Sequence, residues 1–322
     1  MILAIGNVDE QVRERLAPHG PLVEVEPDDR EAIGHRLPHA IAIVARAAAV
    51  VDQGVIDAAP RLRVIGRSGV GVERVDLDAA TRRGIPVVVT PNGGTRGVAE
   101  GTLALMLHLV KRLGPLTALV ADGRWHERDA LPVGDLDGAT LAVIGYGRIG
   151  RRVAELARAF GMRVLAHDPY ADDAPYGFEE ALNAADVISL HAPLTTESQD
   201  LINDAALRLV KPGAVLINCG RGGLLDLDAA YAALLDGRLS GIGLDVFDPE
   251  PPDDHPLFHH PDVVLTPHVM ALSHRARALV FEEMAAGIDD VLSGRRAHAV
   301  ANPRVYDDAR VCGRGARALG RG

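Results

Sequence analysis

The stretch from Leu141 to Asp168, LAVIGYGRIGRRVAELARAFGMRVLAHD, constrains the fold of this chain more than any other. It reads as an apolar strand, a turn with glycines in GxGxxG spacing, an amphipathic helix, a second apolar strand and an acid. Gly145 permits the tight turn, Gly147 lets a pyrophosphate approach the backbone, and Gly150 lets helix and strand pack closely. The stretch therefore predicts a dinucleotide-binding βαβ unit, with the pyrophosphate at the helix N-terminus.

Asp168 indicates which dinucleotide this unit binds. It lies at the end of the second predicted strand, where a carboxylate accepts hydrogen bonds from the ribose hydroxyls of NAD and repels the 2′-phosphate of NADP. The next residues are Pro169 and Tyr170, so no arginine follows directly to hold that phosphate. We therefore expect NAD as the cofactor.

Length and charge limit the class of protein. A chain of 322 residues is long for one hydrophobic core and comfortable for two. The net charge of −10 argues against a nucleic-acid or anionic-membrane surface. The apolar run Ala40–Val51 is interrupted by Arg46 and is too short to span a membrane. The N-terminal sequence lacks the basic region of a signal peptide. We expect neither nucleic acid nor membrane as a partner.

The cysteines indicate the compartment. Cys219 and Cys312 are far apart in the chain, so they offer neither a disulfide framework nor the spacing of metal ligands. The sequence therefore predicts no metal site and a reducing, cytoplasmic environment.

The N-terminal part alternates apolar runs with helical patterns. Strands are expected at Ile2–Ile5, Leu22–Val25, Ala40–Ala45, Leu62–Ile65 and Pro86–Val89, and helices at segments such as Asp9–Ala17 and Val75–Arg83. This pattern predicts a domain with a parallel sheet. Its first turn, Gly6-Asn7-Val8, lacks the GxGxxG spacing, so we expect no second nucleotide site there.

A long apolar helix is expected from Gly97 to about Ala121, with a kink or break at Pro115, and a loop follows over Asp122–Asp137. After Asp168 the alternation resumes. Strands are expected at Val187–Leu190, Ala214–Asn218, Gly241–Val246 and Val263–Thr266, and helices near Phe178–Ala184, Asp204–Leu209 and Leu227–Leu235. The final helix, Ser273–Leu292, is long enough to leave this domain and pack on the first.

The expected fold is therefore α/β, with two doubly wound parallel-sheet domains: a Rossmann NAD-binding domain and a flavodoxin-like substrate domain. The substrate domain is expected to contain residues 1–97 and 286–303, and the NAD domain residues 98–285. Residues 304–322, where glycine and arginine alternate, predict a disordered tail, with an RNA-binding segment as the alternative.

Three polar residues follow three separate predicted strands. They are Arg221, Glu250 and His268. Because the carboxyl ends of parallel strands share one edge of a sheet, these side chains are expected beside the glycine turn, where ligands bind. Each alone has a simpler interpretation, as a surface arginine, a solvated glutamate or a structural histidine. Together, and beside a dinucleotide fingerprint, they favour an active site.

Several motifs give the chain a family resemblance. They are GRSGVGVERVDLDAATRRGIPV (66–87), VAEGTLALML (98–107), GYGRIG with HDPY, HAPLTTES (191–198), NCGRGG (218–223), LDVFDPEPP (244–252) and LTPHV (265–269). With these motifs the chain resembles the D-isomer-specific 2-hydroxyacid dehydrogenase family over about residues 40–303, and most closely its phosphoglycerate dehydrogenase branch.

The resemblance implies roles for individual residues. Arg221 would bind the carboxylate and carbonyl of the substrate, His268 would be the general acid and base, and Glu250 would pair with His268. A guanidinium fork suits a 2-keto acid, and an imidazole serves proton transfer in both directions near neutral pH. The implied cofactor contacts, besides the glycines, are Arg148, Ile149, Asp168, Ala192, Pro193, Cys219, Gly220 and Asp245.

The expected substrate site lies in the first domain. The turn Ser68–Gly71 can offer backbone N–H groups to a carboxylate, and the resemblance places Val70 near substrate and cofactor. Arg67 is expected to hold a remote phosphate or second carboxylate, with a solvent-facing arginine as the alternative. The predicted substrate-binding residues are thus Arg67, Ser68, Gly69 and Val70.

The expected activity is that of an NAD-dependent D-2-hydroxyacid dehydrogenase with its active site in the cleft between the domains, and D-3-phosphoglycerate is one candidate substrate. The alternatives are a glyoxylate/hydroxypyruvate reductase and, from another class, an NAD-sensing corepressor-like binding protein. The resemblance also implies a homodimer through the NAD domain, where Val98–Val110 supplies an apolar helix surface.

The chain departs from the family pattern at three points. Glu73 stands where the family commonly has Asp, and Met270-Ala271-Leu272 stands where it has Gly shortly after the TPH motif. Met270 adds bulk near the expected active site, which leaves the identity of the substrate open. The length of the chain leaves no room for an appended regulatory domain, so feedback through one is not expected.

Overall fold

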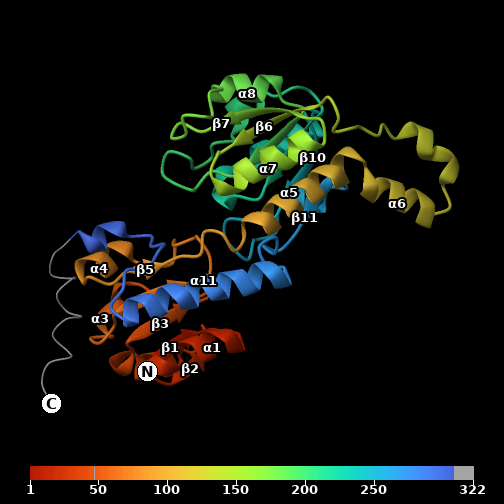
Figure 1. Cartoon of the computed structure of the whole chain (residues 1–322). Coiled ribbons are helices and arrows are strands. Elements are labelled where there is room, and N and C mark those ends of the chain that lie inside the picture. Colours follow the sequence, from red (N-terminus) through yellow and green to blue (C-terminus); the bar gives the residue numbers. More distant parts are fainter. Residues whose placement is uncertain (47, 308–322) are drawn as a thin grey trace, which may run out of the picture. The chain divides into compact units, whose positions relative to one another are not determined.

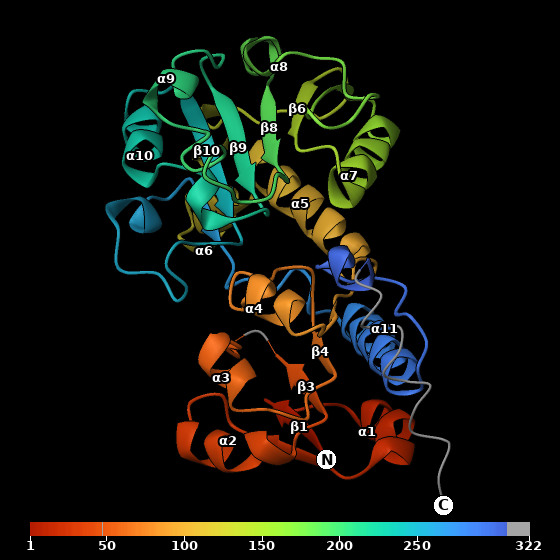
Figure 2. The same ribbon diagram turned by 90° about the vertical axis from the view of Figure 1, so that its left-hand side faces the viewer.

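The computed structural model describes residues 1–46 and 48–307 of the chain. They form two compact units (Figures 1 and 2). Unit 1 consists of Met1–Gly94 together with the chain from His274 onward, and unit 2 consists of Thr95–Ser273. Each unit is built on one parallel sheet with helices on both faces, so the predicted fold class of two doubly wound domains is confirmed.

Unit 1 has a five-stranded parallel sheet in the order β2-β1-β3-β4-β5, the flavodoxin-like order. Its strands lie within two residues of the predicted ones: β1 (Ile2–Ile5), β2 (Leu22–Val25), β3 (Ala42–Ala45), β4 (Val64–Arg67) and β5 (Val87–Val88). The helices are α1 (Glu10–Leu16), α2 (Arg30–Arg36), α3 (Gln53–Asp57), α4 (Leu77–Arg82) and α11 (His274–Leu292), with short turns η1 (Ala17–His19) and η2 (Leu37–His39).

Helix α11 corrects the predicted domain boundary. The whole helix belongs to unit 1, so the boundary lies between Ser273 and His274 and not at 285/286. The reason is packing: Phe281 and Met284 are fully buried in a core cluster with side chains of β1 and β3. An added Cβ at Gly66 of β4 would lie 2.4 Å from Cδ1 of Ile288, so this helix lies directly on the sheet of unit 1.

Unit 2 has a six-stranded parallel sheet in the order β11-β10-β9-β8-β6-β7. Its strands are β6 (Thr140–Ile144), β7 (Arg163–His167), β8 (Val187–Leu190), β9 (Ala214–Asn218), β10 (Leu239–Leu244) and β11 (Val263–Leu265). The chain passes from β6 to β7 on one side and then to β8 on the other. The order therefore reverses beside β6, at the point where doubly wound sheets bind ligands.

Two helical layers cover this sheet. Helices α5 (Thr95–Val110) and α7 (Arg148–Ala159) bury their apolar side chains in a cluster with β6 and β9. Helices α8 (Phe178–Ala184), α9 (Asp204–Leu207) and α10 (Leu227–Leu235) pack in a second cluster (Figure 2). The turns η4 (Gly222–Leu224) and η5 (Pro256–His259) lie in loops that follow β9 and β10.

The predicted helix Gly97–Ala121 is two helices. The break falls at Arg112, which has a φ of 54°, and α6 (Leu113–Ala121) follows with a bend of 55°. Pro115 lies in the first turn of α6, where its missing N–H is not needed. The predicted loop after α6 contains η3 (Trp125–Ala130), and α6 and η3 extend away from the sheet (Figure 1).

No single helix of the described chain is long and apolar enough to cross a membrane, although the bent pair α5 and α6 passes the same test on length and composition. The first residues of the predicted disordered tail are ordered, because Pro303–Tyr306 form η6 and Val305 is buried. The rest of the predicted tail, from residue 308 on and including Cys312, lies outside the described residues.

Candidate active site

The glycine turn after β6 is tight at two glycines and open at the third. Gly145 has a φ of 93°, and an added Cβ there would lie 2.4 Å from the backbone nitrogen of Ala192. At Gly150 an added Cβ would lie 2.1 Å from the carbonyl oxygen of Gly145. At Gly147 it would have no neighbour within 4 Å. The backbone is therefore open at the position where the sequence predicts the pyrophosphate.

Helix α7 begins directly at this turn. Gly147 is its N-cap, Arg148 and Ile149 are its first two residues, and its first turn contains no acidic residue. The first N–H groups of a helix have no partner within the helix, and the dipole makes this end positive. The start of α7 therefore suits an anionic group.

Asp168 follows β7 and supports the same turn. Its Oδ2 accepts a hydrogen bond from the backbone N–H of Tyr146 at 2.8 Å, and its Oδ1 accepts one from Tyr170 N–H at 2.9 Å. A carboxylate has about four lone-pair sites, so both oxygens keep capacity for further donors. Asp168 thus places a negative charge beside the glycine turn.

Glu250 and His268 form a hydrogen-bonded pair. Nδ1 of His268 lies 3.0 Å from Oε1 and 2.9 Å from Oε2 of Glu250, and both side chains are partly exposed. Oε1 of Glu250 also accepts the backbone N–H of Phe247 at 3.1 Å. The carboxylate orients the imidazole through Nδ1, so Nε2 is the nitrogen left for a substrate.

Asp245 organises the loop that carries His268. This carboxylate is buried, and its Oδ1 accepts the Thr266 hydroxyl at 2.7 Å and the Val269 N–H at 3.0 Å. Its Oδ2 accepts the Met270 N–H at 3.3 Å. The sequence predicted Asp245 only as a cofactor contact and missed this supporting role, which depends on the three-dimensional proximity of β10 and β11.

Arg221 lies on the turn after β9, next to the loop that carries Glu250. An added Cβ at Gly222 would lie 2.0 Å from the carbonyl carbon of Phe247, so the two loops touch through their backbones. Asn218 fixes the turn, because its side chain accepts from Gly220 N–H at 3.0 Å and donates to the Arg221 carbonyl at 2.9 Å. The three predicted catalytic residues therefore follow adjacent strands β9, β10 and β11.

The residues predicted to contact the cofactor differ in whether their backbone or their side chain is available to a ligand. Ala192 lies against Gly145 through its backbone, and the next residue, Pro193, is exposed. The Cys219 side chain is buried in the core beside α5, which leaves mainly its backbone for a ligand. Burial raises the pKa of the Cys219 thiol to about 12, against a smaller opposite effect of a hydrogen bond with Thr102.

In unit 1 the predicted substrate loop is only partly available. Ser68 N–H donates to the Ala45 carbonyl and Gly69 N–H to the Arg67 carbonyl, so the predicted anion nest is limited to Val70 and Gly71. Val70 is half-exposed. Arg67 is buried and donates to the carbonyls of Gly71 at 3.0 Å and Ala45 at 3.3 Å. Arg67 therefore holds the loop, and its contact with substrate stays a prediction.

His191 opens the HAPLTTES motif, and the sequence predicts no role for it. Its Nε2 lies 2.8 Å from the Ser189 hydroxyl, and its Nδ1 is buried without a hydrogen-bond partner in the described chain. Burial lowers the pKa of His191 to about 4, so the ring is neutral at pH 7. It stands directly before Ala192, at the edge of the glycine turn.

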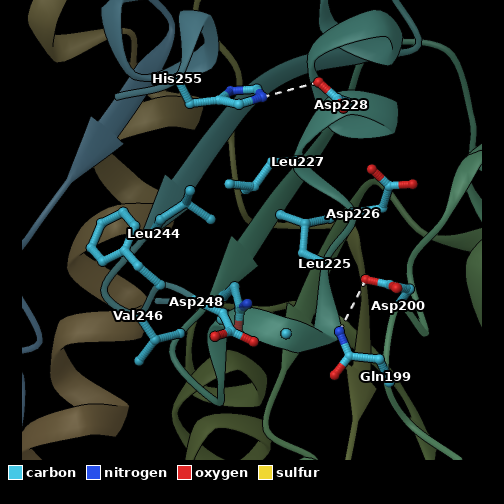
Figure 3. A pocket seen from close by; sticks show the side chains of 14 residues that line it. Gln199, Asp200, Leu225, Asp226, Leu227, Asp228, Leu244, Val246, Asp248 and His255 are labelled. Atoms are coloured by element: carbon cyan, nitrogen blue, oxygen red, sulfur yellow. Dashed lines mark hydrogen bonds and ion pairs between the residues drawn. The ribbon is translucent and has the colours of Figure 1, made fainter. Parts of the chain in front are cut away.

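A pocket of about 370 Å³ lies in unit 2 beside the Gly222–Gly223 turn (Figure 3). Its lining is acidic and includes Asp200, Asp226, Asp228 and Asp248, with His255 paired to Asp228 at 3.1 Å. These charges do not suit an anionic substrate. Across residues 1–46 and 48–307, no group of His, Cys, Asp or Glu is arranged to hold a metal ion.

Comparison with known proteins decides the family. Residues 103–270 match the model of the D-isomer specific 2-hydroxyacid dehydrogenase, NAD binding domain. The chain belongs to this family. D-3-phosphoglycerate dehydrogenase of Sus scrofa is 37% identical over 317 residues, which are 96% of this chain and 59% of that protein. The chain thus spans less than two thirds of the length of this curated relative.

Solved structures agree with this assignment. The D-lactate dehydrogenase of Aquifex aeolicus, solved with NAD and lactic acid, is 30% identical with a TM-score of 0.84, over 94% of this chain and 99% of that one. A glyoxylate reductase of Paecilomyes thermophila is 27% identical with a TM-score of 0.85, over 93% and 97% of the two chains. The family assigned from sequence motifs is therefore confirmed.

Proposed function

We propose that this member of the D-2-hydroxyacid dehydrogenase family catalyses the reversible interconversion of a 2-hydroxy acid and a 2-keto acid with NAD(H). The observation that carries the proposal is the Glu250–His268 pair, at 2.9 Å, on the sheet edge that also carries Arg221 and the glycine turn. This chemistry needs a group that transfers a proton, a guanidinium that binds the acid and a turn that binds the dinucleotide, and all three lie on one edge of the sheet.

The residues around the glycine turn fit NAD. Gly147 leaves the backbone open, the start of α7 carries no acid, and Asp168 keeps lone pairs for ribose hydroxyls. Gly145, Gly147, Arg148, Ile149, Gly150 and Asp168 would hold the adenosine and pyrophosphate, and Ala192, Pro193, Cys219, Gly220 and Asp245 the nicotinamide end. When bound, NAD(H) accepts or supplies the hydride.

The chain's own residues would bind the acid and move the proton. The Arg221 guanidinium would hold the substrate carboxylate and polarise the carbonyl through its planar fork. His268 would donate a proton from Nε2 to the developing alkoxide during reduction and remove it during oxidation. Glu250 would hold Nδ1–H, fix the tautomer and stabilise the imidazolium form.

D-3-phosphoglycerate is the first substrate to test, because a curated relative at 37% identity is named D-3-phosphoglycerate dehydrogenase. The Arg67 guanidinium donates to the carbonyls of Gly71 and Ala45. It would bind the phosphate of this substrate only with N–H groups that these two hydrogen bonds leave available. A glyoxylate or hydroxypyruvate reductase is the second candidate, supported by the similar glyoxylate reductase structure.

A turnover assay with a substrate panel tests these proposals. NADH oxidation would be followed with about a dozen 2-keto acids, and NAD reduction with D-3-phosphoglycerate and D-lactate. Activity that prefers the phosphorylated acid supports the first candidate, and activity with glyoxylate or hydroxypyruvate supports the second. NADH binding without turnover of any 2-keto acid would instead support a corepressor-like binding protein.

We also propose a cytoplasmic homodimer, without nucleic acid or membrane as a partner. In the structure most apolar side chains of Val98–Val110 are buried in unit 2 itself, so α5 offers less surface than the sequence predicted. Exposed apolar side chains lie instead on or beside α6 and η3, namely Leu113, Val120, Trp125 and Val133. Sedimentation of the wild type and of Val120→Asp with Trp125→Ala tests whether they form the interface.

A further inference from the structure

Met270 fills a notch in helix α5. An added Cβ at Gly101 would lie 2.1 Å from Sδ and 2.7 Å from Cγ of Met270. Real Cβ atoms do not approach other atoms so closely, so Met270 has to move if position 101 carries a Cβ. Met270 is partly buried and packs against the core cluster that contains side chains of α5. The bulk predicted near the substrate therefore lies against this helix.

The residue two positions earlier, His268, has an unusual backbone. Its φ of 52° is in the left-handed region, which costs a residue with a Cβ about 1 kcal/mol or more. Such a conformation persists only where the surroundings hold it. Here the chain is held directly after His268, at Val269 and Met270.

The two attachments act from different elements. Asp245 holds the backbone N–H groups of Val269 and Met270 by hydrogen bonds. The notch at Gly101 holds the Met270 side chain by contact with α5. A hydrogen-bonded carboxylate fixes the backbone, and an apolar side chain in a fitted notch resists displacement because its contacts are lost together.

We propose that Met270 and Gly101 are a matched pair that positions His268 against Glu250. Met270 is a positioning residue, because it acts through the loop and does not touch the reacting atoms. The inference rests on the proposed function only in that His268 is the acid and base. The position of its imidazole is a property of the protein without substrate and is measurable as such.

The test uses the full chain and four variants. Gly101→Ala forces Met270 out of the notch, and Met270→Ala leaves the notch empty. The double variant Gly101→Ala/Met270→Ala places the new methyl group in the vacated space. Met270→Leu keeps the apolar volume. Gly34→Ala is the matched control, because Gly34 lies in α2 and an added Cβ there meets nothing within 4 Å.

We expect Gly101→Ala to lower kcat about ten- to a hundredfold, the loss typical of a catalytic group displaced by about 1 Å. The affinity for NADH, measured by fluorescence titration, should stay within about twofold, because the glycine turn is untouched. The double variant should recover about tenfold in kcat over Gly101→Ala, Met270→Leu should approach wild type, and Gly34→Ala should equal it.

A spectroscopic readout does not require turnover. In ¹⁵N-histidine-labelled protein the His268 ring signal, assigned by its loss in His268→Asn, should report Nδ1–H donation to Glu250. That signal should change in Gly101→Ala and return in the double variant. If Gly101→Ala does not fold, Met270→Ala against Met270→Leu gives the same comparison. An unchanged His268 signal and kcat in either Gly101→Ala or Met270→Ala overturns the proposal, whether or not a 2-keto acid is the substrate.

Discussion

The two units contain the same strand–glycine–helix turn, and only one of them is open. In unit 1 the turn after β1 has Gly6 at a φ of 98°, and in unit 2 the turn after β6 has Gly145 at 93°. Each glycine N–H donates to the carbonyl of the neighbouring strand, at 2.8 Å to Val25 and at 2.9 Å to His167. The backbone frame of a nucleotide site is therefore present twice.

The acid beside the turn is also present twice. Glu24 of β2 accepts the Val8 N–H at 2.7 Å, as Asp168 accepts the Tyr146 N–H at 2.8 Å. The units differ in what lies at the start of the next helix. In unit 1, Asp9 is the N-cap and Glu10 follows, so the helix start is negative. In unit 2 the corresponding positions are Gly147 and Arg148.

The turn of unit 1 is also filled by side chains. An added Cβ at Gly6 would lie 3.0 Å from Arg46, whose guanidinium donates to the Asn7 carbonyl at 2.7 Å, and Arg277 of α11 pairs with Asp9. Both units therefore have a glycine turn with a carboxylate beside it, although their sequences differ there. A nucleotide site needs in addition an unfilled turn and a helix that begins without a carboxylate.

The largest expected effect is a difference in NADH affinity between alanine variants of Gly145 and Gly6. Gly145→Ala should lower NADH affinity by more than about a hundredfold, because the new Cβ would collide with the Ala192 backbone at 2.4 Å and move the turn. Gly6→Ala, with the same positive φ, should cost about 1–2 kcal/mol of unfolding free energy and leave NADH affinity unchanged. Fluorescence titration and urea unfolding of both variants measure this, and equal losses of affinity would refute the comparison.

The second test compares two arginines at strand ends, one in each unit. Arg221→Lys should lower kcat/KM about a hundredfold, because an ammonium group does not reproduce the guanidinium fork. Arg67→Lys should lower it less than about tenfold, since Arg67 is buried and donates to its own loop. The measurement is kcat/KM with the best keto acid of the panel. A nearly wild-type Arg221→Lys enzyme would place substrate recognition elsewhere.

The third test compares the two acids. Asp168→Ala should reduce the preference for NAD over NADP, measured as the ratio of kcat/KM values, by about tenfold, because repulsion of the 2′-phosphate is lost. Glu24→Gln removes the carboxylate charge that accepts from the turn of unit 1 and should leave that ratio unchanged. It should only lower stability, since Glu24 also pairs with Arg13 at 2.7 Å. An unaltered ratio in Asp168→Ala would mean that another residue selects the cofactor.

Much of this was predictable because the signals are local. Gly145, Gly147 and Gly150 follow a strand and open a helix, so spacing alone predicts their turn. The predicted strand ends also place Arg221, Glu250 and His268 after three strands that are neighbours in the sheet. The prediction that unit 1 binds no nucleotide also rests on a local signal, the missing GxGxxG spacing at Gly6-Asn7-Val8. Boundaries were less accurate, as for α11, because apolar periodicity does not state which sheet a helix covers.

The rest depends on contacts between distant segments. Asp245 joins β10 to the His268 loop, and Met270 joins that loop to Gly101 of α5. The burial of the Nδ1 atom of His191 likewise depends on packing that the sequence does not state. Arg67 showed the same limit, since the loop motif does not reveal that its guanidinium is bound to the carbonyls of Gly71 and Ala45. Single-residue patterns carry no information on such pairings.

The smallest effect concerns the core beneath the open turn of unit 2. Cys219 shares a core cluster with Tyr146 of that turn, and burial raises the pKa of its thiol to about 12. In a Cys312→Ser background, iodoacetamide should label Cys219 at pH 8 far more slowly than a peptide thiol, because only the thiolate reacts. Urea should abolish this protection. Rapid labelling of the folded protein would show that solvent and reagent reach the core beneath the turn.

The same thiol gives a pH dependence with a fixed sign. Because the folded pKa lies above the unfolded value of about 8.5, the protonated thiol stabilises the fold below that pH, and the stability is lost as pH rises toward 12. The loss should approach about 1.4 kcal/mol per pH unit. Urea unfolding at pH 8 and pH 10.5 should show a larger decrease for Cys312→Ser than for Cys312→Ser/Cys219→Ala, whose turnover should stay within about twofold. Equal decreases in unfolding free energy would mean that the Cys219 thiol ionises in the folded protein. Solvent would then reach the core beneath the glycine turn of unit 2.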